Sequence, residues 1–104
     1  MQITATAQGA TLFISLDGEM DEHTAKAARQ AADEAIDGHL SVSRAVFNLR
    51  NVAFMDTTGI GFLIGRYKKL KKMGISAYIS EPNGGTDKIL TLSGIYTLIP
   101  KINV

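Results

Sequence analysis

An acid, two threonines and a glycine occupy residues 56–59 of the stretch FMDTTGIGFLIGRYKKLKKMG, which spans residues 54–74. The apolar residues that follow recur every three or four positions, which predicts a helix. Asp56 stands just before it, where a carboxylate accepts hydrogen bonds from the free N–H groups of the first turn. Capping explains one polar side chain at most, and threonine has below-average helix propensity. A second hydroxyl at this place therefore needs another reason.

Phosphorylation is a specific use for such a hydroxyl. The N-terminus of a helix carries about half a positive charge and presents unpaired N–H donors. A phosphate added there brings a charge of about −1.5 to −2 without melting the helix. Modification of Thr57 or Thr58 would thus change what the surface binds while sparing the fold.

Few other side chains in the sequence could bind a metal ion or act in catalysis. The chain has two histidines, His23 and His39, and no cysteine. It contains no H-E-x-x-H motif, no Asp-rich calcium loop and no G-x-S-x-G turn. We therefore expect no metal site, no cofactor and no enzymatic activity. His23 follows two acids at a predicted helix start and is expected to be solvated rather than a general base.

Glycines and lysines in the same stretch have structural explanations. Glycines at 59, 61 and 65 approximate a dinucleotide fingerprint, but the spacing G-x-G-x-x-x-G is one residue too long. We expect them to let the helix approach a sheet closely, with nucleotide binding as the alternative. The basic residues from Arg66 to Lys72 complement the negative end of the helix dipole. Contact with an acidic partner is the alternative for them, and no aromatic ladder accompanies them for binding nucleic acid.

The composition predicts one domain over residues 1–104. Hydrophobic residues make up 45 % of the chain and charged residues 20 %, as in ordinary globular domains. The net charge of +1 gives no field that would attract nucleic acid or an acidic membrane. We find no signal peptide or membrane-spanning segment, and the lack of cysteine fits a reducing compartment. A cytoplasmic protein is expected.

Strand and helix patterns alternate along the chain. Residues 2–7 and 11–16 flank Gln8-Gly9 and predict a hairpin. The Ala-rich residues 21–36 predict a helix with acids in its first turn and a left-handed stop at Asp37-Gly38. The next helix follows Asp56 and stops at Gly74. Its predicted apolar face comprises Ile60, Leu63, Ile64, Tyr67 and Leu70.

Three further strands complete the predicted order β-β-α-β-α-β-α-β. They lie at 44–49, at 75–80 and, as an edge strand, within 95–104. A loop at 82–85 and a short helix at 86–93, ending at Gly94, separate the last two. Strands alternating with helices imply parallel pairing, which the opening hairpin makes mixed. We expect an α/β fold, close to α+β, with about four or five strands.

The stretch at 54–74 resembles the phosphorylation-site helix of the anti-sigma factor antagonists, F-M-D-S-S-G-[LI]-G followed by apolar residues, R-Y and basic residues. GEMDEHTA at 18–25 is similar to the family's G-E-[LI]-D-x-x-[TN]-A, and LSGI at 92–95 to its x-S-G-[LI]. The resemblance spans nearly the whole chain in the same order. It implies a single STAS domain (sulfate transporter and anti-sigma factor antagonist) with helices on one side of the sheet.

The resemblance also implies a partner switch in sporulation or stress signalling. The unphosphorylated antagonist binds an anti-sigma factor that is a GHKL-type serine kinase, and this frees the sigma factor. Phosphorylation releases the antagonist, and a PP2C-type phosphatase resets the cycle. Carried over by position, the acceptor is Thr58, with Thr57 second. The implied partner surface comprises Asp21, Asp56, Thr57, Thr58, Gly59, Ile60 and Gly61.

This chain departs from the family pattern in two ways. Threonine replaces serine at both hydroxyl positions, and many members carry a final helix where this chain stops at Val104. The alternative is therefore a STAS domain in another assembly, such as a stress-signalling scaffold or a lipid-transporter partner, without a phospho-switch. A nucleotide-binding protein is the third possibility.

Overall fold

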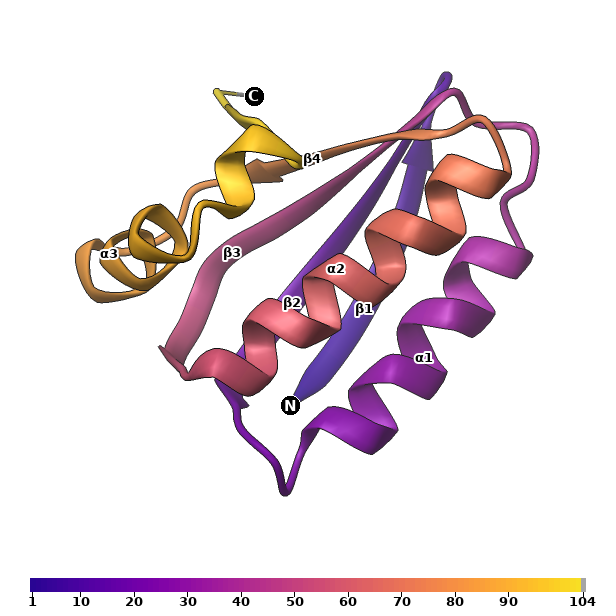
Figure 1. The fold of residues 1–104 in the computed structure, drawn as a ribbon. Coiled ribbons are helices and arrows are strands. Elements are labelled where there is room, and N and C mark those ends of the chain that lie inside the picture. Colours follow the sequence, from indigo (N-terminus) through magenta and orange to yellow (C-terminus); the bar gives the residue numbers. More distant parts are fainter. Residues whose placement is uncertain (104) are drawn as a thin grey trace.

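A five-stranded sheet with helices on one side forms the fold, in a computed structural model that describes residues 1–103 (Figure 1). The strands are β1 Gln2–Gln8, β2 Thr11–Met20, β3 Arg44–Met55, β4 Ser76–Ser80 and β5 Lys101–Ile102. The helices are α1 Ala25–Asp37, α2 Thr57–Lys72 and α3 Gly84–Ser93, followed by the 3-10 turn η1, Ile95–Thr97. None of the described helices has the length and apolar content that a membrane span requires.

The strands lie in the sheet in the order in which they occur in the chain. β1 and β2 form an antiparallel hairpin, and each later strand pairs in parallel with its predecessor. Parallel neighbours need a crossover, which each helix supplies in turn. The predicted element order and mixed sheet are confirmed, with η1 as an addition. The hairpin loop is Gly9-Ala10 rather than Gln8-Gly9, because Gln8 still pairs with Thr11.

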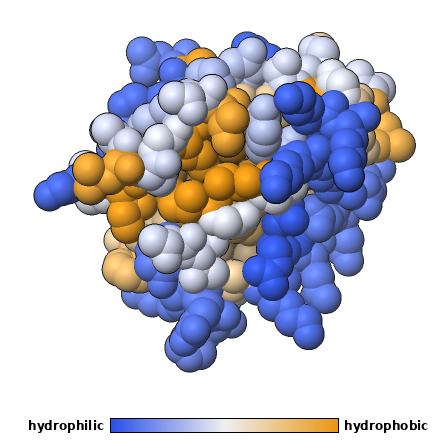
Figure 2. All heavy atoms as spheres, viewed as in Figure 1, coloured by the Kyte–Doolittle hydropathy of each residue, from blue (hydrophilic) through white to orange (hydrophobic). Residues whose placement is uncertain are grey.

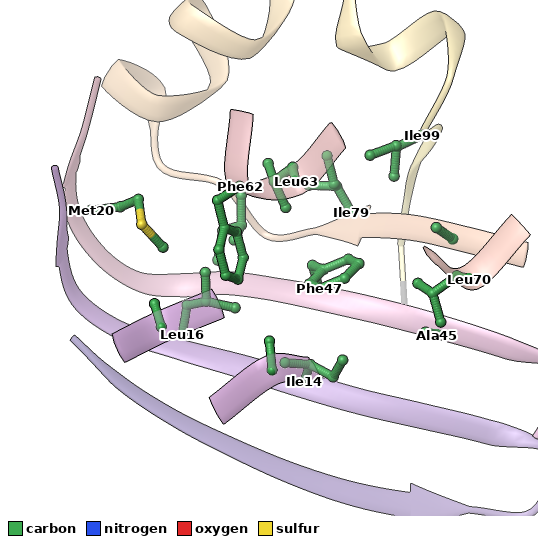
Figure 3. Close-up of a cluster of buried hydrophobic side chains, with 14 of the residues drawn as sticks. Ile14, Leu16, Met20, Ala45, Phe47, Phe62, Leu63, Leu70, Ile79 and Ile99 are labelled. Carbon is green, nitrogen blue, oxygen red and sulfur yellow. The ribbon is translucent and has the colours of Figure 1, made fainter. Parts of the chain in front are cut away.

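The core lies between the sheet and the helices (Figure 3). Alternate residues of β2 and β3, among them Ile14 and Phe47, are fully buried. The ring of Phe62 on α2 meets that of Phe47 edge-on, with centroids 6.4 Å apart. Leu90 of α3 joins the same cluster. The helices therefore share one apolar core on one face of the sheet.

β2 and β3 continue beyond their predicted ends. β2 reaches Met20 rather than residue 16, and β3 reaches Met55 rather than residue 49. Register shifts between Ser15 and Asp17 and between Gly18 and Glu19 mark irregularities in this half of the pair. A bulge interrupts the two-residue alternation of buried and exposed side chains. Because the alternation is interrupted, the sequence pattern did not predict the extension of the two strands.

α1 begins later than predicted and ends differently. It starts at Ala25 rather than Asp21, so the acids precede its first turn. Gly38 has φ −80°, which is right-handed, so the predicted left-handed stop at Asp37-Gly38 is wrong. The Gly38 N–H instead donates to the Glu34 carbonyl and closes the last turn. Gly74, by contrast, ends α2 with φ 74°, as a glycine stop predicts.

One of the three glycines of α2 is needed for the helix to lie close to the sheet, as predicted. A Cβ on Gly59 would collide with the side chain of Met55, whose Sδ would lie 2.7 Å away. Gly61 and Gly65 have open space at the same point, so the prediction is wrong for them. All three lie within α2 rather than in a loop that could cradle a phosphate. The glycine spacing thus gives no support to nucleotide binding.

Arg66 is buried, unlike the lysines that follow it. Its Nε lies 2.8 Å from Asp33 Oδ1 of α1, and its guanidinium carbon lies 5.3 Å from the Phe62 ring centroid. Burial lowers the pKa of Arg66, and the charge of Asp33 opposes that shift. The Nη1 atom is buried without a hydrogen-bond partner among residues 1–103. Arg66 therefore joins α1 to α2 instead of belonging to the solvated basic face.

Alanine at positions 59 and 61 should shift stability in opposite directions. Gly59→Ala forces the buried Met55 side chain to move, and overpacking of this kind costs about 1–3 kcal/mol of unfolding free energy. Gly61→Ala places a methyl group in open space on a helix and should add about 0.5–1 kcal/mol. Urea unfolding monitored by circular dichroism measures both changes. Shifts of equal size and sign would contradict the packing role of Gly59.

Replacing either of two aspartates on α1 by asparagine should lower the free energy of unfolding, but by different amounts. Asp33→Asn leaves the buried Arg66 charge without its counter-ion, and because Asp33 is 35 % exposed we expect a loss of about 1–2 kcal/mol. Asp37→Asn breaks an outer pair with Lys69, in which Asp37 is 61 % exposed, and should cost under about 0.5 kcal/mol. Urea midpoints compare the two variants. An equal loss in both would contradict a structural role for the Arg66 pair.

Candidate functional site

Two aspartates follow paired residues at the carboxyl end of the sheet. Met20 and Met55 are register partners at the ends of the parallel strands β2 and β3. Asp21 and Asp56 are the next residues in each strand's direction. The Asp56 N–H donates to the Met20 carbonyl at 3.3 Å and ties the two chain exits together. The start of α2 and the turn before α1 are thereby brought to one edge.

Asp56 caps α2 as predicted. Its Oδ1 accepts a hydrogen bond from the Thr58 N–H at 2.8 Å, and its backbone is extended. The Gly59 N–H donates to the Asp56 carbonyl at 3.0 Å. Capping thus engages the main chain of Thr58 and leaves its hydroxyl for another use. Thr57 is exposed and Thr58 half-buried, so Thr57 is the more accessible of the two.

Asp21 organises the turn that precedes α1. Its Oδ1 accepts from the N–H groups of His23 at 2.8 Å and Thr24 at 3.2 Å. The Thr24 hydroxyl donates to the Glu19 carbonyl at 2.9 Å, which fixes the turn to the end of β2. One quarter of the Asp21 side chain remains exposed. The His23 side chain is 83 % exposed, as expected for a solvated residue.

The remaining predicted site residues divide between surface and core. Gly61 is exposed and Ile60 half-buried on the first turns of α2. Gly59 is buried against Met55 and shapes the edge through packing rather than by facing outward. The structure therefore gathers Asp21, Asp56 and the two threonines at the surface, with Gly59 beneath them.

An apolar band crosses the surface between α2 and the α3–η1 segment, while the surface over α1 is hydrophilic (Figure 2). Ile60 and Ile64 of α2 and Ile89 of α3 are only partly buried. The sequence predicted Ile60 and Ile64 on the core face, but the buried face is turned toward Phe62 and Arg66 instead. Apolar surface is thus left next to the threonine-bearing turn of α2.

Phe54 and the start of α3 were missed by the sequence reasoning. Phe54 is 50 % exposed and lines a hollow of about 250 Å³ together with residues of α3. α3 begins at Gly84 rather than residue 86, because Asn83 caps it by accepting from the Thr86 N–H at 2.8 Å. The Asn83 amide also donates to the Val52 carbonyl at 2.7 Å. The available signal was Asn83 itself, because asparagine is among the preferred N-cap residues.

The functional groups at this edge that could take part in a reaction are hydroxyls and carboxylates. A threonine hydroxyl can accept a phosphoryl group, and the carboxylate of Asp56 would then stand beside a second negative charge. No group of three or more His, Asp or Glu side chains that could hold a metal ion occurs within residues 1–103. The arrangement suits a reversible change of surface charge next to an apolar band.

Comparison with known proteins identifies relatives of this fold and sequence. The model of the STAS domain matches residues 2–103. The chain is 32 % identical over 100 residues to the anti-sigma F factor antagonist of Paenibacillus polymyxa, which covers 96 % of this chain and 85 % of the relative.

Two solved structures share the fold. The anti-sigma factor antagonist SpoIIAA in its unphosphorylated form has a TM-score of 0.78 at 23 % identity, covering 98 % of this chain and 89 % of SpoIIAA. The Bacillus cell fate determinant SpoIIAA in its phosphorylated form has a TM-score of 0.70 at 23 % identity, with coverage of 98 % and 92 %. The resemblance to the anti-sigma factor antagonists, which was inferred from the sequence motifs, is confirmed. The chain belongs to the STAS-domain family.

Proposed function

We propose that this protein is an anti-sigma factor antagonist whose unphosphorylated form binds an anti-sigma factor and so releases a sigma factor. The observation that carries the proposal is the shared edge at Asp21 and Asp56, where two motifs distant in sequence meet. The name of the Paenibacillus polymyxa relative supports the same role. The proposed partner is a GHKL-type serine kinase in the cytoplasm, with a PP2C-type phosphatase to reverse the modification. No catalytic activity is proposed for the chain itself.

The proposed docking surface combines polar and apolar groups. Its polar part is the aspartates and threonines of the shared edge, with Ile60 and Gly61 beside them. The exposed ring of Phe54 and the apolar band between α2 and α3 extend it. Interfaces commonly surround an apolar centre with a polar rim, and aromatic residues are enriched in that centre. This surface offers both parts within one face.

Phosphorylation of Thr58 would end binding through electrostatics. It adds a charge of about −1.5 to −2 beside the Asp56 carboxylate, which already contacts the Thr58 N–H at 2.8 Å. A partner that covers this edge would have to bury the phosphate without a counter-charge, which is costly. The helix N-terminus favours an anion, so the fold should survive the modification. SpoIIAA, which shares this fold, has been solved in both phosphorylated and unphosphorylated forms.

A STAS binding module without a switch is the second candidate. Thr58 is half-buried, and its methyl group adds bulk that a serine lacks. Both features hinder a serine-directed kinase. The same edge would then bind a partner constitutively, in a signalling scaffold or a transporter complex.

Phosphopeptide mapping should distinguish the two candidates and the two hydroxyls. We expect the cognate anti-sigma kinase to modify the wild type and Thr57→Ala, and to leave Thr58→Ala unmodified. Thr58→Ser should be phosphorylated faster, because it removes the hindering methyl group. Mass spectrometry after incubation with kinase and ATP measures each product. Modification of Thr58→Ala but not of Thr57→Ala would move the site to Thr57, and no modification of any variant would favour the constitutive module.

Thr58→Asp should abolish binding while preserving the fold. A carboxylate at this position carries part of the charge of a phosphate, and we expect binding to the cognate anti-sigma factor to weaken by about 100-fold or more. Thr91→Asp, at an exposed threonine on α3, is the matched control and should bind like the wild type. Calorimetry measures the affinities, and circular dichroism verifies folding. Equal affinity of Thr58→Asp and the wild type would contradict the proposed surface.

A further inference from the structure

The first half of strand β4 has a neighbouring strand on one side and none on the other. β3 pairs with β4 over the whole strand, from Ser76 to Ser80. β5 pairs with β4 only through Ile79 and Ser80. The segment from Ser76 to Tyr78 therefore lies at an open edge of the sheet. An open strand edge is a template for pairing with another extended chain.

The hydrogen bonds of β4 identify the free backbone groups. The Ser76 N–H donates to the Ser43 carbonyl on the β3 side, and the Ile79 N–H donates to the Pro100 carbonyl on the β5 side. Backbone groups alternate sides along a strand, so the N–H and C=O of Ala77 point to the same side as those of Ile79. No strand lies opposite Ala77 on that side among residues 1–103. The N–H and C=O of Ala77 are thus left without a strand partner within residues 1–103, and Ala77 as a whole is 5 % exposed.

The open edge lies in a hollow of about 420 Å³. Its walls come from α2, from β4 and from the segment before β5. They include Tyr67, Lys71, Ala77, Tyr78, Leu98 and Pro100. Ala77 packs into the core face while Tyr78 points to the opposite face, so the hollow follows the strand edge from one face to the other. Leu98 is 45 % exposed within it.

The chain beyond the hollow is fixed, so β5 does not extend to fill it. The Tyr96 hydroxyl donates to Asp87 Oδ1 at 2.6 Å, and Lys101 Nζ lies 3.0 Å from the same oxygen. Ile99 is fully buried, and its N–H donates to the Ile95 carbonyl. These contacts fix the segment between η1 and β5, whose Leu98 and Pro100 line the hollow together with Ala77.

We propose that this edge binds an extended acidic segment of a partner protein, which pairs with Ala77 as an added strand. One side chain of that segment would face Tyr67 and Leu98, and the next would face Tyr78, which selects apolar or aromatic residues at two successive positions. Lys71 lines the hollow with its Nζ 5.8 Å from the Tyr67 ring centroid. Its charge selects an acidic residue in the segment.

Charge also argues against a second copy of this chain as the occupant. Symmetric pairing of two β4 edges about Ala77 would bring the basic ends of both α2 helices together. Like charges at an interface disfavour association. The proposed site is separate from the threonine edge, because Thr58 and Lys71 stand at opposite ends of α2, roughly 20 Å apart at 1.5 Å per residue.

Amide hydrogen exchange tests the open edge directly. In the free protein the Ala77 amide should exchange at least about tenfold faster than the Ile79 amide, which donates to the Pro100 carbonyl. Protection of Ala77 equal to that of Ile79 would overturn the proposal, because the edge would then be closed.

Peptide selection tests the occupant. Random seven-residue peptides displayed on phage are selected on the full chain, and the enriched peptides should carry two adjacent apolar or aromatic residues together with an Asp or Glu. By fluorescence anisotropy, Lys71→Glu should weaken binding of the enriched peptide by about tenfold or more. Lys72→Glu, at an exposed neighbour outside the hollow, should change it less than about twofold. The bound peptide should protect the Ala77 amide.

The other outcomes overturn the proposal. They are no enrichment, enriched peptides without acidic residues, equal loss in Lys71→Glu and Lys72→Glu, or self-association of the free chain that occludes Ala77. Thr58→Asp should bind the enriched peptide within about twofold of the wild type, because the two sites are far apart compared with the screening length. Loss of peptide binding in Thr58→Asp would place the peptide on the threonine edge and reject this site. Failure of the anti-sigma proposal would leave these results unchanged.

Discussion

The parallel pairing of β2 with β3 up to Met20 and Met55 is the constraint on which the remaining structure depends. It brings together two chain exits that are 35 positions apart in the sequence, since 55 − 20 = 35. The Asp56 N–H bond to the Met20 carbonyl closes this pair, and α2 begins at the next residue. A shift of one residue in this register would move Asp21 away from Asp56 and turn the buried side chains of β2 to the wrong face.

The start of α2 is fixed a second time by packing. Gly59 leaves no room for a side chain above Met55, while Phe62 reaches the Phe47 ring from the next turn. Arg66 then joins the helix to α1 through Asp33. These contacts orient the first turn so that Thr57 and Thr58 face outward over a closed core. The proposed modification of Thr58 would need such a rigid base, because it must change the surface without changing the fold.

Much of this arrangement could be predicted from the sequence, and the errors have identifiable causes. The element order, the mixed sheet and the Asp56 cap followed from periodicity and capping chemistry. The extensions of β2 and β3 did not, because bulges near Gly18 interrupt the alternation on which strand prediction relies. The burial of Arg66 could not be predicted, since its partner lies on another helix and nothing local distinguishes it from the lysines around it. Phe54 is exposed because it faces away from the core at the end of a strand whose length was underestimated.

The two ends of α2 carry opposite charges for a structural reason that also separates their proposed functions. The Asp56 cap at the N-terminal end and the lysines at the C-terminal end both stabilise the helix dipole. Helix stability therefore accounts for the acid at Asp56 and for the basic edge at Lys71, while the pairing of β2 with β3 places Asp21 beside Asp56. With a screening length of about 8 Å at physiological ionic strength and a separation of roughly 20 Å, a phosphate at one edge has little effect on the other. One helix can thus serve a switched surface and an unswitched one without coupling them.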